Sequence, residues 1–172
     1  MSATAPVARP VSADDPRLLP WRSFLVAHAR VTRRLDEELR AEHDLSLAEY
    51  DALLTIARSP GRRMRMGALA DEVLLSKSGV TRLVDRLVAD GLVERRICAS
   101  DARGAEAELT RAGVDKLRTA SQTHLRGIAE HFLSAVDDED LAVLGRVLTE
   151  LADRVGGPAE GGVNGGPLEP AD

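Results

Sequence analysis

The segment from Met66 to Gly104 constrains the fold more than any other part of the chain. Leu69 and Val73 lie four residues apart, so they share one face of a short helix. Ser76 is a suitable N-cap for a second helix, because its hydroxyl can accept a hydrogen bond from a free backbone N–H. Gly91 suits the left-handed position that ends such a helix. The segment therefore predicts two short helices joined by a tight turn.

The second of these helices has one apolar face and one polar, partly basic face. The apolar side chains, which recur at helical spacing, are Val80, Leu83, Val84 and Leu87. The side chains that turn outward are Lys77, Ser78, Thr81, Arg82, Asp85 and Arg86. A DNA-binding helix-turn-helix presents such a face to the major groove, although a solvated surface helix has the same pattern.

The residues after Gly91 favour the DNA-binding interpretation. Residues 92–97 are strand-like, and residues 105–109 alternate between apolar and polar with the period of a strand. The polar residues 99–104 between them form turns readily, so they predict a hairpin with a basic tip. A helix-turn-helix followed by a charged hairpin is a winged helix, which can contact a major groove and the adjacent minor groove. The predicted fold class is mainly α with a small β-hairpin wing.

These residues resemble the MarR-type winged-helix repressors. The resemblance rests on the run LADEVLLSKSGVTRLVDRLVADGLVERR, on residues 101–104 (Asp-Ala-Arg-Gly) and on Leu109-Thr110, and it extends over roughly residues 18–155. It implies a homodimeric regulator that binds double-stranded DNA at a pseudo-palindromic operator and is released by a small ligand. It also implies that Arg103 enters the minor groove and that Asp101 orients it.

The chain departs from the family pattern at the wing. Ala102 stands where the family often has a second arginine, and Glu106 and Glu108 place acid on the return strand. These acids either lower DNA affinity or pair across the hairpin with Arg95 or Arg96. The alternative function is accordingly a small-molecule-binding dimer with weak or lost DNA affinity.

Charge is distributed unevenly along the chain. The 172 residues carry a net charge of −5, but the segment from Arg58 to Arg111 carries +3 and the remainder −8. Positive charge thus gathers in the segment proposed to meet phosphates. The side chains expected to contact DNA are Ser76, Lys77, Ser78, Thr81, Arg82, Arg86, Arg96, Asp101 and Arg103.

Long apolar-faced helices flank the winged helix. Helical spacing predicts one helix over about residues 18–42, a second from Thr110 to about Val136, and a third ending near Val155. Their apolar faces exceed what a small winged helix can cover, so a C₂ homodimer is favoured over an intramolecular bundle. The expected organisation is a disordered tail (1–16), an N-terminal dimerisation helix (17–45), the winged helix-turn-helix lobe (46–110), C-terminal dimerisation helices (111–155) and a disordered Gly/Pro-rich tail (156–172).

The resemblance also implies an effector cleft between the dimerisation helices and the DNA-binding lobe. The chain has only four aromatic residues, and the candidates to line this cleft are Trp21, Phe24, His28 and Tyr50, with Arg58 to neutralise a ligand carboxylate. The alternative is that the aromatic side chains are ordinary core and that Arg58 is a solvated helix end.

No motif for catalysis, a cofactor or a metal stands out in the sequence. Gly61, Gly67 and Gly79 lack the spacing of a phosphate loop, and the four histidines include no pair at i, i+4. Cys98, the single cysteine, lies near basic residues that can lower a thiol pKa, but a structural role is favoured over redox sensing. The N-terminal residues have no apolar run, so a cytoplasmic protein without a membrane anchor is expected.

Overall fold

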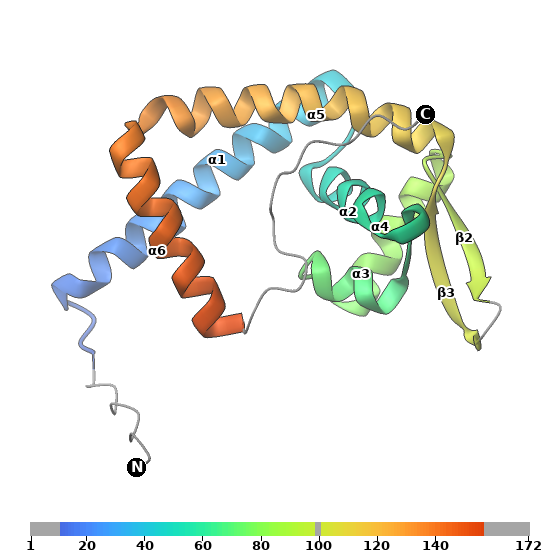
Figure 1. Ribbon diagram of the computed structural model, residues 1–172, viewed down its shortest axis with the longest axis horizontal. Helices are drawn as coiled ribbons and strands as arrows, with labels where there is room; N and C mark the ends of the chain where they lie inside the picture. Colours follow the sequence, from blue (N-terminus) through green and yellow to red (C-terminus); the bar gives the residue numbers. More distant parts are fainter. Residues whose placement is uncertain (1–10, 99–100, 157–172) are drawn as a thin grey trace, which may run out of the picture. The chain divides into compact units, whose positions relative to one another are not determined.

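The computed structural model describes residues 11–98 and 101–156, with side chains described outside residues 97–104 (Figure 1). The chain forms two compact units, one up to His131 and one from Phe132, and each is considered by itself. The first unit contains η1 (Pro16–Leu18), α1 (Leu19–His43), α2 (Leu47–Arg58), η2 (Pro60–Arg62), β1 (Arg63–Arg65), α3 (Met66–Glu72), α4 (Lys77–Ala89), β2 (Val93–Cys98), β3 (Asp101–Leu109) and α5 (Arg111–His131). The second contains η3 (Leu133–Ala135) and α6 (Asp138–Gly156). The predicted fold class, mainly α with a small wing, is confirmed.

Serine side chains cap the N-termini of α2 and α4, and the cap of α4 by Ser76 was predicted. Ser46 Oγ accepts a hydrogen bond from Glu49 N at 3.2 Å, and the Glu49 carboxylate accepts one from Ser46 N at 2.9 Å, which completes a capping box on α2. Ser76 Oγ accepts a hydrogen bond from Gly79 N at 3.1 Å at the start of α4. Gly91 follows α4 with a φ of 69°, where a residue without Cβ meets no steric penalty.

The turn between α3 and α4 contains a residue that the pattern did not single out. Leu74 has a φ of 53°, and its side chain is 91% exposed. The left-handed region costs a residue with a Cβ roughly 1–2 kcal/mol. The backbone bond from Leu75 N to Ala70 O, at 3.0 Å, holds the turn in this conformation.

The wing belongs to a three-stranded antiparallel sheet in the order β1-β3-β2. Met64 in the short strand β1 pairs with Ala107 of β3, and α3 begins directly after β1 at Met66. β3 begins at Asp101, although residues 101–104 were predicted as a turn. Pairing with β2 continues as far as Cys98 and Asp101, past an irregularity between Ile97 and Cys98. Backbone pairing with a neighbouring strand thus outweighs the weak strand propensity of these residues.

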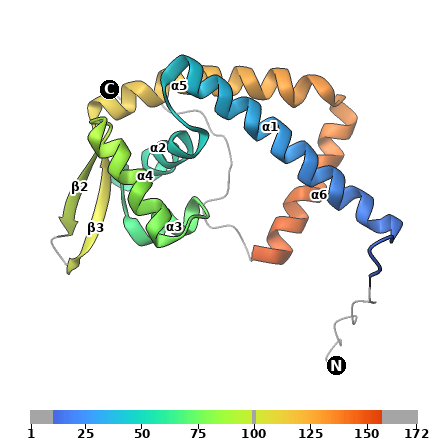
Figure 2. The same cartoon turned by 180° about the vertical axis from the view of Figure 1, so that it is seen from behind.

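The core of the first unit joins its helices to the sheet. Figures 1 and 2 show, from opposite sides, α2, α3 and α4 beside the sheet, with the start of α5 next to it. Fully buried side chains come from every layer and include Leu39, Leu53, Leu69, Leu87, Val93 and Leu117. This packing fixes α4 with its polar face outward.

The long helix α1 is buried along only part of its length. Leu35 and Leu39 pack into the unit, whereas Trp21 and Phe24 remain 55% and 41% exposed. Near the end of α1, Thr123 of α5 donates a hydrogen bond to Glu42 at 2.9 Å. The first half of α1 therefore presents apolar surface that this unit does not cover. The N-terminal segment expected to be a tail lies outside the described residues up to residue 10, and η1 begins within it at Pro16.

The helix predicted to run from Thr110 to Val136 is shorter than expected. α5 ends at His131, and Phe132 leaves the helical region with φ −123° and ψ −60°. No glycine or proline stands at this position, and the apolar periodicity continues beyond it. The sequence therefore predicted a helix that is too long. Asp137 caps α6 by accepting a hydrogen bond from Asp140 N at 2.9 Å. The expected C-terminal tail lies outside the described residues from residue 157 onward.

Candidate nucleic-acid interface

Helix α4 presents a polar face that the core leaves free. Val80, Leu83, Val84 and Leu87 are buried, and the six predicted DNA-contacting residues on or beside α4 are all exposed. Arg82 and Lys77 make no ion pair with any side chain in the described part of the chain. Ser76 is already engaged as the N-cap, and its Oγ also lies 3.2 Å from Ser78 Oγ. α4 therefore presents two cations that have no ion-pair partner among the described side chains.

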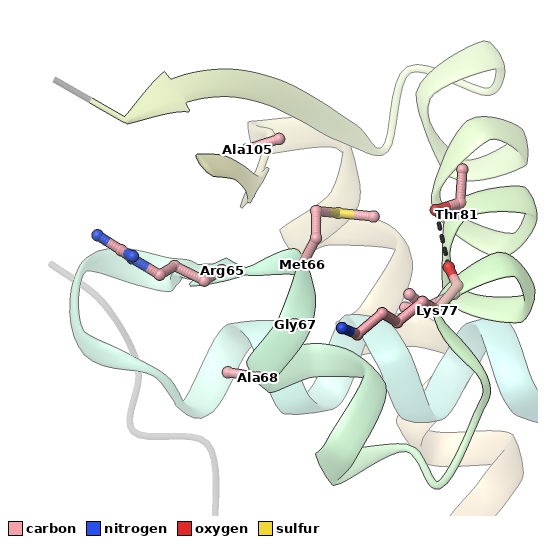
Figure 3. A pocket seen from close by; sticks show the side chains of 8 residues that line it. Arg65, Met66, Gly67, Ala68, Lys77, Thr81 and Ala105 are labelled. Carbon is pink, nitrogen blue, oxygen red and sulfur yellow. Dashed lines mark hydrogen bonds between the residues drawn. The ribbon is translucent and has the colours of Figure 1, made fainter. Parts of the chain in front are cut away.

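A hollow of about 420 Å³ lies beside α4, between the start of α3 and the central strand (Figure 3). Its lining consists of Arg65, Met66, Gly67, Ala68, Lys77, Val80, Thr81 and Ala105. Thr81 Oγ1 donates a hydrogen bond to Lys77 O at 2.8 Å, which keeps the threonine side chain against its own helix. Small residues line part of this hollow, and Arg65 and Lys77 add positive charge to it. The hollow is therefore suited to a polyanionic backbone.

Arg95 joins the wing to α4. Its Nη1 lies 2.9 Å from Asp85 Oδ1, and its Nη2 donates to Thr81 O at 3.2 Å. The sequence left open whether Arg95 or Arg96 pairs across the hairpin. The contact with Asp85 spans two elements, and no local spacing could have revealed it. Arg95 therefore links strand β2 of the wing to α4.

Arg96 makes the cross-hairpin ion pair that the sequence allowed. Its Nε lies 2.5 Å from Glu108 Oε2, and its Nη2 lies 3.3 Å from Glu94 Oε2. A phosphate that binds Arg96 has to compete with both carboxylates. Asp101 and Arg103 lie in β3, but their side chains fall outside the described residues, so their predicted roles remain predictions.

Arg86 is held by an acid from another helix. Arg86 Nε donates to Glu49 Oε1 at 2.7 Å, and the Glu49 side chain is only 11% exposed. Burial opposes the ionisation of Glu49, but hydrogen bonds from Ser46 and Arg86 outweigh it and hold the pKa of Glu49 below its ordinary value. This ion pair was missed at the sequence level because its partners are far apart in the chain.

Of the five residues expected to bind an effector, three lie beside one another on α1, and the other two belong to α2. Trp21, Phe24 and His28 lie in a row along the exposed first half of α1. The ring centroids are 6.2 Å apart for Trp21 and Phe24 and 6.1 Å apart for Phe24 and His28. Tyr50 is buried in the core instead, where its hydroxyl donates to Ser121 Oγ at 3.3 Å. Arg58 is exposed at the end of α2. Tyr50 thus has the ordinary core position that the sequence left open as an alternative.

A second hollow, of about 640 Å³, lies between α1 and α2. Its lining consists of His28, Ala29, Thr32, Arg33, Asp36, Leu47, Ala48 and Asp51. His28 belongs to the predicted effector set, whereas Asp36 and Asp51 bring carboxylates that the prediction did not include. This hollow offers hydrogen-bonding groups of both charges rather than an aromatic cage.

Tyr50 packs against His124, which makes the core sensitive to acid. The two ring centroids are 4.4 Å apart, His124 Nδ1 is buried without a partner among the described residues, and burial lowers the pKa of His124. The neutral imidazole is thus favoured in the folded state, and protons bind preferentially to the unfolded state.

We expect His124 to destabilise the protein as the pH falls below the ordinary histidine value of 6.5. Its contribution is complete above that value and is lost as the pH falls toward the lower folded pKa, with a slope of at most about 1.4 kcal/mol per pH unit. Urea unfolding at several pH values between neutral and mildly acidic measures this slope for the wild type and for His124→Gln. Identical slopes in both proteins would contradict the assignment.

Glu38, Glu130 and His131 are grouped where α1 meets the end of α5. Their possible ligand atoms all lie within 4.8 Å of one another, and His131 Nε2 lies 2.5 Å from Glu38 Oε1. A hydrogen-bonded histidine–carboxylate pair accounts for this geometry.

No helix among the described residues has the length and apolar character needed to cross a membrane.

Comparison with known proteins identifies the family pattern in the same region. A family model described as "MarR family" matches residues 43–104. An HTH-type transcriptional regulator of Bacillus cereus is 25% identical over 128 residues, which cover 74% of this chain and 83% of that protein.

Solved structures extend the similarity to most of the chain. AbsC, a MarR family transcriptional regulator from Streptomyces coelicolor, is 30% identical with a TM-score of 0.74, over 86% of this chain and 97% of AbsC. A MarR family regulator from Silicibacter pomeroyi is 31% identical with a TM-score of 0.69, over 84% of this chain and 99% of that one. Sco3205 from S. coelicolor, solved in complex with DNA, is 29% identical with a TM-score of 0.78, over 92% of this chain and 97% of that one.

Proposed function

Because this chain belongs to the MarR family of transcriptional regulators, we propose that it binds a pseudo-palindromic DNA operator as a homodimer and represses transcription. The observation that carries the proposal is the exposed face of α4, with Lys77 and Arg82 unpaired among the described side chains and a basic-edged hollow beside it. α4 enters the major groove, and the wing reaches the neighbouring minor groove through Arg103. The protein acts in the cytoplasm, where its DNA is.

The exposed apolar surface supports dimerisation. Trp21, Phe24, Leu25 and Val26 are exposed along the first half of α1, and Val143, Val147, Leu151 and Val155 are exposed along α6. Two chains related by a two-fold axis can bury these faces together. The dimer then places its two α4 helices at half-sites one helical turn, about 34–36 Å, apart.

A small effector weakens the DNA complex by binding better to a conformation with the two α4 helices displaced. The hollow between α1 and α2, which includes His28, is the candidate site within the first unit. The chemical nature of its lining favours a molecule that donates and accepts hydrogen bonds. This proposal replaces the aromatic set that included Tyr50.

Fluorescence anisotropy on DNA from upstream of its own gene, with unrelated DNA alongside, tests the DNA-binding function. Tight, selective binding with a steep dependence on salt concentration is expected, because lysine and arginine contacts release counterions from the phosphates. Weak and equal binding to both DNAs would favour the alternative, a ligand-binding dimer without DNA affinity. The pairing of Glu108 with Arg96 neutralises one acid of the return strand, but it also occupies one of the arginines expected to contact DNA.

Replacing Arg103 with Ala is expected to weaken operator binding by about 1–3 kcal/mol, because an arginine contact to the DNA is lost. Unrelated DNA should be bound almost as before, apart from the loss of one phosphate-attracting charge. Titration of both DNAs at one salt concentration measures the difference. An unchanged operator affinity would remove the wing tip from the proposed interface.

A further inference from the structure

The carboxylate of Glu49 binds two partners: Ser46 at the start of its own helix and Arg86 of α4. Its Oε2 accepts hydrogen bonds from Ser46 N at 2.9 Å and from Ser46 Oγ at 2.6 Å, which cap α2. Its Oε1 accepts the hydrogen bond from Arg86 Nε at 2.7 Å. An N-cap needs only the first of these oxygens, so the second is available to hold α4.

The helix end that carries Glu49 is itself fixed. Leu47 N, in the first turn of α2, donates to Asp36 Oδ1 of α1 at 2.8 Å, and Asp36 is held in turn by Arg40 at 2.7 Å. A charged acceptor held by its neighbours has little freedom to follow a moving arginine. The carboxylate of Glu49 is therefore a fixed reference point for α4.

Arg86 is bound along one edge and remains 58% exposed. It lies one turn after Arg82 on the same helix, toward the side of α4 that faces α2. Arg82 has no ion-pair partner among the described side chains. The two arginines thus differ in that Arg86 is bound to an acid of another helix, whereas Arg82 is not.

We propose that Glu49 is a positioning residue for DNA recognition, which orients Arg86 through Nε and leaves the remainder of the guanidinium to bind the operator. This inference rests on the proposed DNA-binding function. An arginine that is oriented in advance loses fewer rotamers on binding, so the operator complex gains affinity. The ion pair should raise the affinity for the operator sequence and not for random DNA. A flexible arginine can bind the phosphates of random DNA in many orientations, so orienting it in advance gives no advantage there.

The test uses full-length protein and a duplex selected by the wild type from a random pool, with an unselected duplex alongside. Glu49→Gln keeps the cap, because glutamine also completes a capping box, but it removes the charge that holds Arg86. We expect it to bind the selected duplex about tenfold more weakly. Binding to the unselected duplex should be unchanged or tighter, because an acid has been removed.

A double-mutant cycle separates positioning from a purely structural role. Arg86→Ala should weaken binding of the selected duplex strongly in the wild type and little in Glu49→Gln. Arg82→Ala is the matched control and should cost the same in both backgrounds. Equal costs of Arg86→Ala in both backgrounds, or wild-type selectivity of Glu49→Gln, would overturn the proposal.

Two further arms keep the result interpretable. If Glu49→Gln fails to fold by circular dichroism, Arg86→Lys leaves the cap of α2 intact and keeps the charge but lacks the Nε edge. It should lose affinity for the selected duplex alone, and wild-type affinity would overturn the proposal. If the wild type selects no duplex from the pool, the DNA-binding function itself fails, which is distinct from failure of the positioning role.

Discussion

Replacing Arg82 with Glu is expected to reduce operator affinity at least about 100-fold while leaving the fold intact. Arg82 lies on the outward face of α4, is exposed, and makes no ion pair with a described side chain. The substitution removes a cation and places an anion against the phosphates, and like charges brought together cost several kcal/mol. An exposed position with no partner should change the free energy of unfolding by less than about 0.5 kcal/mol.

Anisotropy titration of the operator at constant salt concentration measures this effect, with thermal unfolding as a check on the fold. The matched control is Arg118→Glu, which makes the same charge change on α5, where Arg118 Nη2 lies 3.1 Å from Asp115. The control should bind the operator within about threefold of the wild type, because only long-range electrostatics change. Wild-type affinity of Arg82→Glu would exclude α4 from the interface.

Replacing Gly113 with Ala is expected to destabilise the protein by about 2–3 kcal/mol through overpacking. A Cβ at Gly113 would lie 2.1 Å from the backbone oxygen of Leu92 and 3.1 Å from Leu109 Cδ2. That oxygen accepts a hydrogen bond from Thr110 N at 3.1 Å, so Leu92 cannot withdraw without breaking it. The start of α5 would have to move away from the segment that connects α4 to the wing.

Differential scanning calorimetry should show a melting temperature lower by roughly 5–10 °C for a chain of this size. Gly67→Ala is the control, because a Cβ at that helical glycine meets no atom within 4 Å. It should leave stability unchanged or raise it by up to about 1 kcal/mol, since alanine has the higher helix propensity. A wild-type melting temperature for Gly113→Ala would show that α5 does not approach Leu92 so closely.

The helix starts and the order of elements could be predicted because their signals are local. Ser46, Ser76 and Asp137 each satisfy a backbone N–H within the next three residues, so the cap can be recognised from the sequence alone. The outward position of Lys77 and Arg82 follows equally from helical spacing. The end of α5 at His131 could not be predicted, because no glycine or proline interrupts the pattern there.

Contacts between distant segments escaped the same reasoning. The position of Tyr50 against His124 joins residues from α2 and α5 and buries Tyr50 in the core. Side-chain periodicity shows that Tyr50 lies on an apolar face but not which element covers that face. The sequence alone therefore could not show that Tyr50 packs against α5, whereas Trp21, Phe24 and His28 lie beside one another on α1.

The arginines between Arg58 and Arg111 show most clearly what the sequence determines and what the tertiary structure determines. Local patterns were sufficient to place them on a helix-turn-helix and a wing, since caps and periodicity act over a few residues. Only the packing of α2, α4 and the sheet shows which of these arginines are bound by acids of the protein and which are not. Arg95 and Arg86 are bound by acids from other elements, whereas Arg82 is left unpaired among the described residues. Local spacing allowed the hairpin pair of Arg96 and Glu108 to be foreseen. The pairs of Arg86 and Arg95 join separate elements, and only the folded arrangement brings those side chains together.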